Sequence, residues 1–250
     1  MSVKVVRKVR NSTRSLFLQG SLFLLLLLVA IYFFINSSFF SVRAITINGT
    51  KELQKEIVLD LAGTSVGENL IKLDIGQIKA QVELSSMVEF CTVERKFPDQ
   101  LIINIQERQA AALVSYRDGF ILLDKQGYYI RLVNRLTDYN YPLINGAQLP
   151  IDLVPGTKVD GKGLKEALNL VSHVPPGKLL TFTEIHIKPD NNLELYTEDG
   201  IRVLVGDSSN IGRKLQWFFE IYRQLLEGTN KSNIEYVDLS FDGSPIVKYR

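Results

Sequence analysis

Residues 16–35 read LFLQGSLFLLLLLVAIYFFI, an apolar stretch without a charged side chain. Because an α-helix rises about 1.5 Å per residue, this stretch makes a helix about 30 Å long, the thickness of the hydrocarbon core of a bilayer. The apolar character continues to Phe40, and no acidic residue precedes Glu52. The sequence therefore predicts a transmembrane helix over residues 16–36, preceded by a basic tail over residues 1–15.

The basic tail predicts how this helix is oriented. Its five cations are Lys4, Arg7, Lys8, Arg10 and Arg14. Cationic flanks stay in the cytoplasm, so the tail is expected to be cytoplasmic and the bulk of the chain extracytoplasmic. A cleaved signal peptide is the alternative, but its apolar region is about 7–15 residues long and ends in a small-x-small site. Here the run is longer and ends in bulky residues such as Phe39. We expect an uncleaved, single-pass anchor in a cytoplasmic membrane.

Composition limits the function of the remaining 210 or so residues, which suffice for one large or two modest domains. The whole chain carries a net charge of +2, but outside the tail 24 basic and 27 acidic side chains give −3. No basic patch remains there for nucleic acid. Cys91 is the only cysteine, which excludes an internal disulfide. The folded part must therefore be stabilised by its own apolar core.

Residues 42–109 show a β-α-α-β-β pattern. The expected elements are a strand at 44–49, a helix at 51–62 that Thr50 caps, a helix at 74–84, and strands at 89–96 and 100–106. A tight turn at Phe97–Asp99 joins the last two strands. One sheet covered on one face by two helices is a small α+β architecture.

Residues 110–250 show mainly strand patterns. Strands are expected at 112–116, 119–124, 128–132, 184–189, 193–198, 201–205, 234–241 and 245–249, and helices at 164–173 and 211–227. The stretch 134–163 is rich in Pro, Gly and Asn and is expected to be a connection with little regular structure. The chain as a whole is thus predicted to be α+β, with a larger, mostly antiparallel β domain that carries two helices.

The sequence contains several enzyme leads, and each is weak. Gly156–Gly163 fits G-x-x-x-x-G-K, but a phosphate-binding loop needs Ser or Thr where Gly163 stands. His173 and His186 are the only histidines, and with Cys91 they make an improbable metal site. Cys91 is expected to be a small core side chain. We therefore expect no catalysis, no cofactor, no metal and no small-molecule substrate. The aromatic run Trp217–Phe219 could form an exposed patch, but its helical spacing favours the core.

The C-terminal stretch is the remaining candidate for function. Residues 236–250 read YVDLSFDGSPIVKYR, and Pro245 has no amide hydrogen to donate, which places this region at a sheet edge or bulge. An open edge can accept a strand from another chain. The residues expected to contact such a partner are Phe241, Gly243, Ser244, Ile246, Val247, Lys248 and Tyr249. The alternative is an edge that is merely exposed and protected by Pro245, Lys248 and Arg250.

Three motifs resemble a known domain. Val42–Gly49 (VRAITING), Gly67–Leu70 (GENL) and Val93–Arg108 (VERKFPDQLIINIQER) resemble a POTRA domain. Directly after a single N-terminal span, this domain is similar to that of the FtsQ/DivIB bacterial cell-division proteins. The later segments Asp199–Gly206 (DGIRVLVG) and Tyr236–Leu239 (YVDL) agree with that family.

The resemblance implies a non-enzymatic divisome scaffold that acts in septum formation and is concentrated at the division septum. It implies FtsB/DivIC-like and FtsL-like single-span proteins as partners, bound by strand addition at the last strand, besides the lipid bilayer. The POTRA domain would help to bring the protein to the septum. Two alternatives stay open: a membrane-anchored POTRA component of an envelope secretion or assembly apparatus, and a membrane-anchored enzyme of envelope metabolism.

Overall fold

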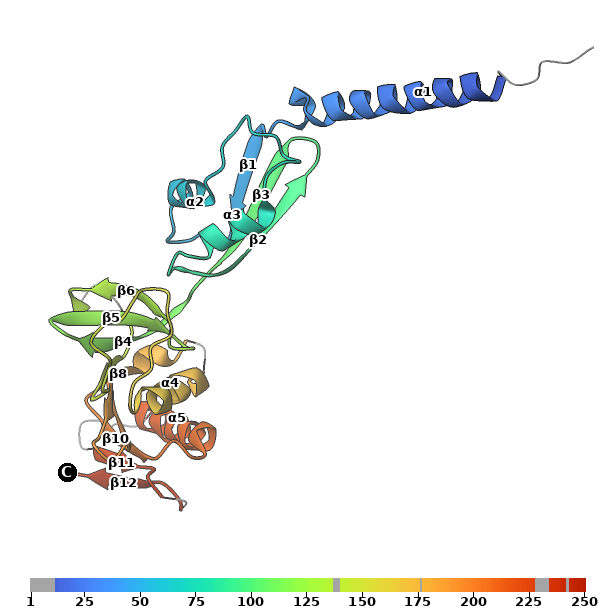
Figure 1. The fold of residues 1–250 in the computed structure, drawn as a ribbon. Coiled ribbons are helices and arrows are strands. Elements are labelled where there is room, and N and C mark those ends of the chain that lie inside the picture. The colour runs from blue at the N-terminus through green and yellow to red at the C-terminus, as the bar shows by residue number, and fades with distance from the viewer. Residues whose placement is uncertain (1–11, 137–139, 176, 228–233, 242) are drawn as a thin grey trace, which may run out of the picture. The chain divides into compact units, whose positions relative to one another are not determined.

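The computed structural model describes residues 12–136, 140–175, 177–227, 234–241 and 243–250. Four of the five tail cations lie outside these residues: Lys4, Arg7, Lys8 and Arg10. The side chain of Arg14 also lies outside the described part, so the predicted membrane orientation stays a prediction. The chain divides into two compact units, Met1–Val82 with Phe90–Ile105, and Glu83–Glu89 with Gln106–Arg250. We describe each unit by itself (Figure 1).

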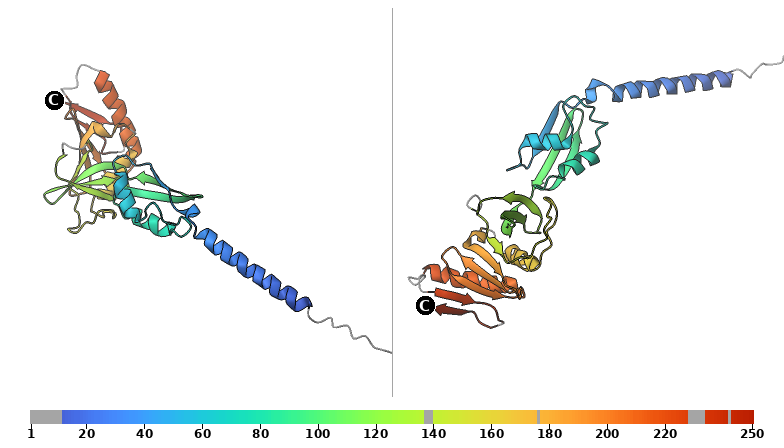
Figure 2. Two further views of the ribbon diagram at one scale, coloured as in Figure 1. Left: turned by 90° about the horizontal axis from the view of Figure 1, so that it is seen from above. Right: turned by 60° about the vertical axis from the view of Figure 1, so that its left-hand side comes forward.

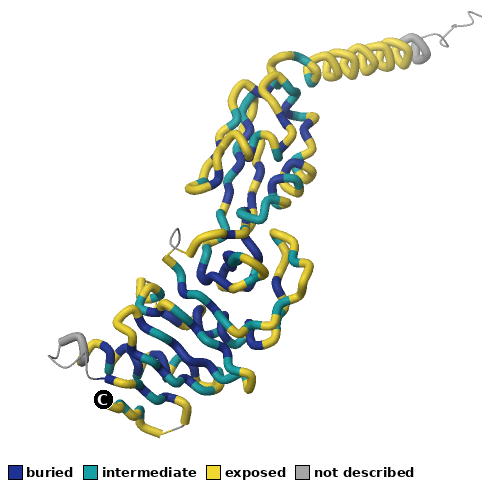
Figure 3. The backbone as a smooth tube through the Cα atoms, turned by 90° about the vertical axis from the view of Figure 1, so that its left-hand side faces the viewer, coloured by how far each residue is buried: buried dark blue, intermediate teal, exposed yellow. Residues whose placement is uncertain are grey.

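The apolar stretch forms one long helix, α1 (Ser12–Ile35). Its side chains from Leu16 to Phe34 are almost all exposed, as Figure 3 shows. In the part of the chain that the structure describes, α1 belongs to the one segment long and apolar enough to cross a membrane. An apolar helix that no other element covers needs an apolar solvent around it, and the helix fits a transmembrane anchor.

The rest of the first unit confirms the predicted β-α-α-β-β order. The elements are β1 (Ala44–Asn48), α2 (Lys55–Ala62), α3 (Ile75–Val82), β2 (Val88–Lys96) and β3 (Gln100–Glu107). The strands form a three-stranded sheet in the order β1-β3-β2, with β1 parallel to β3. The two helices bury Val58, Ala62, Ile78 and Val82. The first residues of β2 and the last residues of β3 belong to the second unit.

The start of α2 differs from the prediction. The helix begins at Lys55 and not at Lys51, and Gln54 rather than Thr50 precedes it. Leu53 has the spacing of a helical core residue, yet it lies in a bend and is buried at 5% exposure. Its side chain reaches the core from outside the helix. The helical spacing of apolar residues therefore predicted a start that is four residues too early. The C-terminal stop is as predicted, because Gly63 adopts a left-handed conformation with φ 59°.

The second unit contains a nine-stranded sheet whose one face is covered by two helices (Figures 1 and 2). Its strands are β4 (Ala110–Tyr116), β5 (Gly119–Asp124), β6 (Tyr129–Val133), β7 (Leu143–Asn145), β8 (Phe182–Ile187), β9 (Leu193–Thr197), β10 (Arg202–Gly206), β11 (Ile234–Asp238) and β12 (Ile246–Tyr249). Their order is β12-β11-β10-β9-β8-β7-β4-β5-β6. Both helices, α4 (Leu164–His173) and α5 (Ile211–Glu227), have the predicted bounds. The mostly antiparallel character is confirmed.

One strand was missed by the sequence reasoning. β7 lies inside the stretch 134–163 that was expected to be irregular, and it occupies the middle of the sheet between β4 and β8. It is parallel to both neighbours and only three residues long, too short for a recognisable alternation of apolar and polar residues. Gly146 follows it with φ 85°, and a Cβ added there would lie 2.1 Å from the carbonyl oxygen of Ile187 in β8.

The core of the second unit lies between the sheet and the two helices. Phe182 of β8 packs against Phe218 and Phe219 of α5, with ring centroids 5.2 and 5.8 Å apart. The prediction that the aromatic run of α5 belongs to the core is confirmed for these two residues, while Trp217 is half-buried at its margin. The predicted core residues Leu225 and Leu226 have side chains outside the described part.

A buried lysine attaches the first turn of α5 to the end of β10. Lys214 is 3% exposed, and its Nζ donates hydrogen bonds to the carbonyl oxygens of Val205 (2.9 Å) and Asp207 (3.0 Å) and to Asp207 Oδ1 (3.1 Å). The Ser209 hydroxyl also donates to Asp207 Oδ1, at 2.6 Å. The hydrogen bond from Ser209, followed by that from Lys214, lowers the pKa of Asp207 from its ordinary value of 3.8.

This lowered pKa predicts a pH-dependent contribution to stability. Because the unfolded chain binds this proton more readily than the folded chain, the stabilisation is complete above pH 3.8 and is lost as the pH falls through the lowered pKa. The variant Asp207→Asn is expected to melt at a lower temperature than the original chain at neutral pH. The difference in melting temperature should shrink below pH 3.8. A difference that stayed constant down to strongly acidic pH would contradict this assignment.

Candidate partner-binding edge

The last strand, β12, forms one edge of the nine-stranded sheet. It pairs antiparallel with β11, and among the described residues no strand pairs with its other side. The register places Asp238 opposite Ile246, Val237 opposite Val247 and Tyr236 opposite Lys248. Figures 1 and 3 show this strand next to the C-terminus, with largely exposed residues.

The direction of the backbone groups of β12 follows from its neighbours. The amide of Leu239 donates to the carbonyl of Leu204 in β10, so the backbone groups of Leu239 and Val237 face β10. By alternation, those of Tyr236 and Asp238 face β12 and meet Lys248 and Ile246. The N–H and C=O of Val247 therefore face away from β11, toward the open side of the edge.

The side chains of β12 alternate between the two faces of the sheet. Val247 packs against the main core, whereas Ile246 is 51% exposed. Lys248 lies on the same face as Ile246, and its Nζ is 3.0 Å from Glu235 Oε2 and 5.5 Å from the ring centre of Tyr236. The hydrogen bond to Glu235 raises the pKa of Lys248, so this side chain is cationic at physiological pH.

The structure separates the seven predicted site residues into two groups. Ile246, Val247, Lys248 and Tyr249 lie on β12 itself. Phe241, Gly243 and Ser244 lie in the connection before it, because β11 ends at Asp238 and not at residue 241 as predicted. Asp238 Oδ1 accepts hydrogen bonds from the amide and hydroxyl of Ser240, which turns the chain out of the strand. Phe241 is 41% exposed.

Two neighbours of this edge were missed by the sequence reasoning. Tyr236 lies between the guanidinium of Arg202, 5.7 Å from its ring centre, and the ammonium of Lys248. Arg202 and Tyr236 are opposite each other in the parallel pair β10–β11. Only the sheet order brings residues 202, 236 and 248 together, although the alternation of apolar and polar residues in YVDL indicates that Tyr236 faces away from the core.

The enzyme leads lie elsewhere and do not converge. The loop Gly156–Gly163 is a packed turn, since a Cβ at Gly163 would lie 2.5 Å from Ile187 Cγ2. Cys91 is fully buried, as predicted, with Sγ 3.7 Å from the carbonyl oxygen of Lys79. His186 is 41% exposed at its side chain and 3.9 Å from Glu184. The described residues contain no group of three potential metal ligands.

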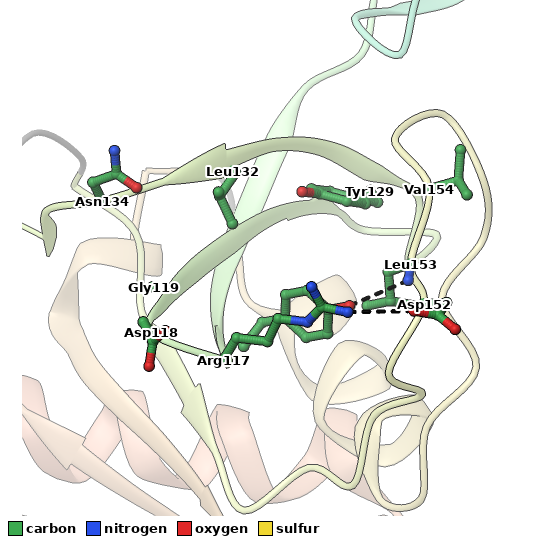
Figure 4. Close-up of a pocket in the computed structure, with 10 residues that line it drawn as sticks. Arg117, Asp118, Gly119, Tyr129, Leu132, Asn134, Asp152, Leu153 and Val154 are labelled. Carbon is green, nitrogen blue, oxygen red and sulfur yellow. Dashed lines mark hydrogen bonds and ion pairs between the residues drawn. The ribbon is translucent and has the colours of Figure 1, made fainter.

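A cavity lies at the opposite end of the sheet (Figure 4). Polar groups that line it form hydrogen bonds within the protein. Its lining residues are Tyr116, Arg117, Asp118, Gly119, Tyr129, Leu132, Asn134, Asp152, Leu153 and Val154. The Tyr116 hydroxyl donates to the carbonyl of Ile151 and accepts from the amide of Leu153. Burial raises the pKa of Tyr129. These groups attach the loop at 151–154 and assemble no acid, base and nucleophile.

The fold and the edge define a class: a membrane-anchored protein with a POTRA domain and a β domain that ends in an open strand. The family described as POTRA domain, FtsQ-type, matches residues 40–108, and the family described as cell division protein FtsQ/DivIB, C-terminal, matches residues 112–240. The chain belongs to the FtsQ/DivIB family of cell division proteins, as the resemblance predicts. It is a single-pass membrane protein with a role in cell division.

Two relatives compared by sequence agree with this assignment. The cell division protein FtsQ of Geotalea daltonii is 30% identical over 219 residues, which cover 85% of this chain and 77% of the relative. The cell division protein DivIB of Clostridium tetani is 22% identical, over 91% of this chain and 85% of its own. A solved structure, the major extracytoplasmic domain of the trans isomer of DivIB from Geobacillus stearothermophilus, covers 50% of this chain and 98% of its own, with 19% identity and a TM-score of 0.34.

Proposed function

We propose that this chain is a non-enzymatic divisome scaffold that recruits and links other single-span division proteins outside the cytoplasm. Its partners are FtsB/DivIC-like and FtsL-like proteins, and it concentrates at the division septum. The observation that carries the proposal is the open side of β12, where the backbone groups of Val247 face outward. Family membership supplies the division role, and the five tail cations support a cytoplasmic N-terminus.

Strand addition explains the composition of this edge. A partner strand that pairs with β12 would gain main-chain hydrogen bonds from Val247, which are the source of affinity in this mode of recognition. The side chains next to Val247 would supply selectivity. Ile246 and Tyr249 are more than half exposed, and Lys248 is cationic. We include Phe241, Gly243 and Ser244 in the contact surface because they lie in the connection that leads directly into β12. Ionic contact with Lys248 favours a partner strand that carries an acidic residue.

The proposed domain organisation places this edge at the far end of the chain from the anchor in sequence. We assign residues 1–15 to a cytoplasmic tail, 16–36 to the membrane span, 42–109 to the POTRA domain and 110–250 to the β domain. In this assignment the β domain supplies the partner edge, and the POTRA domain contributes to septal localisation.

The variant Val247→Pro tests the strand-addition proposal. Proline removes the outward amide hydrogen of Val247 without removing a hydrogen bond to β11, so the fold is expected to persist. Binding of the FtsB/DivIC-like partner from the same organism is expected to weaken about 10- to 100-fold. The measurement is a titration of the labelled partner against the full chain in nanodiscs. Val247→Thr is the matched control, since it keeps the β-branched shape and the amide, and it should bind normally.

Two results would contradict the proposal. Equal partner affinity for Val247→Pro and the original chain would show that β12 is not the contact. The septal part is tested separately with a fluorescent fusion, which should collect at the division site in growing cells. An even distribution around the cell membrane would refute that part and leave the edge proposal standing on its own measurement.

A further inference from the structure

The end of the first unit next to α1 carries aromatic side chains from two separate segments. Phe34 is in the last turn of α1, Phe39 and Phe40 follow that helix, and Phe97 is in the turn between β2 and β3. We call these four residues the aromatic cluster. The ring centre of Phe40 lies 5.2 Å from that of Phe34 and 6.2 Å from that of Phe97. One ring therefore links the hairpin turn to the end of the apolar helix.

Hydrogen bonds hold the end of α1 against the loop at residues 67–70. Asn69 donates from Nδ2 to the carbonyl of Ile35, the last residue of α1, at 2.7 Å. The amide of Leu70 donates to the carbonyl of Phe40 at 2.7 Å, and the amide of Val42 donates to the carbonyl of Glu68 at 2.8 Å. These bonds satisfy a helix-end carbonyl that would otherwise lack a partner, and they place the loop beside the end of the span.

The β2–β3 hairpin is attached to the same loop. Arg95 donates from Nε to the carbonyl of Leu70 at 2.8 Å and from Nη2 to that of Leu73 at 2.5 Å. At the turn, the amide of Arg43 donates to the carbonyl of Asp99 at 2.8 Å. The turn that presents Phe97 is thus linked to the end of α1 through the loop and through the segment that leaves the helix.

Three rings of the aromatic cluster, those of Phe34, Phe39 and Phe97, are exposed. Phe97 is 60% exposed and Phe39 is 52% exposed. Lys96, next to Phe97, is exposed, and Arg43 is 71% exposed at its side chain while it pairs with Asp99 at 3.5 Å. Aromatic rings bordered by cations are typical of the headgroup region of a bilayer, where the ring is in the apolar boundary and the cation meets phosphate.

We propose that the turn of the β2–β3 hairpin inserts Phe97 into the lipid interface at the C-terminal end of α1. The first unit then contacts the bilayer at two places, the anchor and the hairpin turn, so that the POTRA domain is not connected to the membrane by the anchor alone. The occupant of this surface is lipid, because the aromatic cluster is continuous with the apolar helix. The proposal is independent of partner binding at β12.

The test places a tryptophan at the turn of the full chain. In a Trp217→Phe background, the variant Phe97→Trp contains a single tryptophan, because Trp217 is the only one in the original chain. The protein is placed in nanodiscs whose phosphatidylcholine carries bromine on the upper acyl carbons. Emission from the tryptophan at position 97 is expected to fall by about half relative to unbrominated discs, because interfacial rings lie close to those carbons.

Phe90→Trp in the same background is the matched control. Phe90 is in β2, the strand that leads to the turn, and is 47% exposed, but at about 3.3 Å per residue it lies roughly 20 Å from the turn. Bromolipid should leave its emission unchanged, and aqueous acrylamide should quench it more strongly than the tryptophan at position 97. Equal bromolipid responses at the two positions, or none at position 97, would overturn the proposal.

A second measurement needs no introduced tryptophan. Amide hydrogen exchange at residues 96, 97 and 99 is compared between the original chain and Phe97→Ser, both in nanodiscs, since Pro98 has no amide hydrogen. Lipid contact predicts exchange several times faster in Phe97→Ser. Identical exchange in the two proteins would show that the Phe97 ring does not protect the turn, and would also overturn the proposal.

Discussion

Replacing Asp124 with alanine is expected to lower the free energy of unfolding of the β domain by about 3–5 kcal/mol, because it leaves a buried guanidinium without its counter-charge. Asp124 is 2% exposed, and its Oδ2 accepts a hydrogen bond from Arg108 Nη1 at 2.7 Å. Its Oδ1 accepts from the amides of Gln126 and Tyr128, at 2.9 and 2.8 Å. One carboxylate therefore pairs with the guanidinium, whose buried Nε has no hydrogen-bond partner among the described residues, and closes the turn between β5 and β6.

The position of Arg108 explains why the effect should spread beyond one turn. Its Nη2 donates to the carbonyl of Val88 at 3.2 Å, and its guanidinium lies 4.2 Å from the ring centre of Tyr128. Arg108 follows β3 in the chain, so the ion pair attaches the entry into the β domain to its first hairpin. Thermal unfolding of the full chain in detergent micelles would measure the loss.

A second ion pair in the same domain supplies the matched control. Arg117 and Asp152 are 3.3 Å apart, but the side chain of Asp152 is 95% exposed. Exposed pairs contribute at most about 1 kcal/mol, so Asp152→Ala should have a small effect. Asp124→Asn keeps the shape and an acceptor oxygen and should fall between the two. Similar losses for Asp124→Ala and Asp152→Ala would contradict the importance given to burial.

Replacing Gly146 with alanine is the second change with a large expected effect, a loss of about 3–5 kcal/mol from backbone strain and steric overlap together. Gly146 has φ 85°, and a Cβ there would lie 2.1 Å from the carbonyl oxygen of Ile187. That oxygen belongs to the backbone of β8, in the interior of the sheet, so it has little room to move. The expected result is a β domain in which β7 no longer fits between β4 and β8.

Gly200→Ala separates the two causes. Gly200 also has a positive φ, 77°, but nothing lies within 4 Å of the position of its Cβ. This control therefore measures backbone strain alone, about 1–2 kcal/mol. Urea unfolding of both variants gives the comparison. If the loss in free energy of unfolding were no larger for Gly146→Ala than for Gly200→Ala, the steric overlap assigned to Gly146 would be contradicted.

Local patterns predicted most elements of this fold. The bounds of α4 and α5 agree with the spacing of their apolar residues, because each helix packs one apolar stripe on the sheet. The start of α2 was wrong because Leu53 contributes to the core from a bend. β7 was missed because its place depends on pairing with β4 and β8, which are about 30 and 40 residues away in sequence.

The candidate edge could be predicted only in part. Pro245 and the alternation of residues 246–249 indicate an edge strand, and these four residues do form β12. Which backbone groups face outward depends on the register with β11 and on the parallel pairing of β11 with β10. The grouping of Arg202, Tyr236 and Lys248 has the same origin. No local pattern contains this information, because α5 separates β10 from β11 and β12 in the sequence.

The sequence by itself determined the membrane span, the two-domain order and the family, since each depends on residues close together in the chain. Hydrophobic length, the 3.6-residue and 2-residue periods and the motifs around Gly49 and Gly206 are local properties. The tertiary structure decided which strand ends the sheet, which amide of β12 is open, and that Phe97 lies beside the end of α1. These features depend on contacts between distant segments, whose geometry is set by packing and by hydrogen bonds across strands.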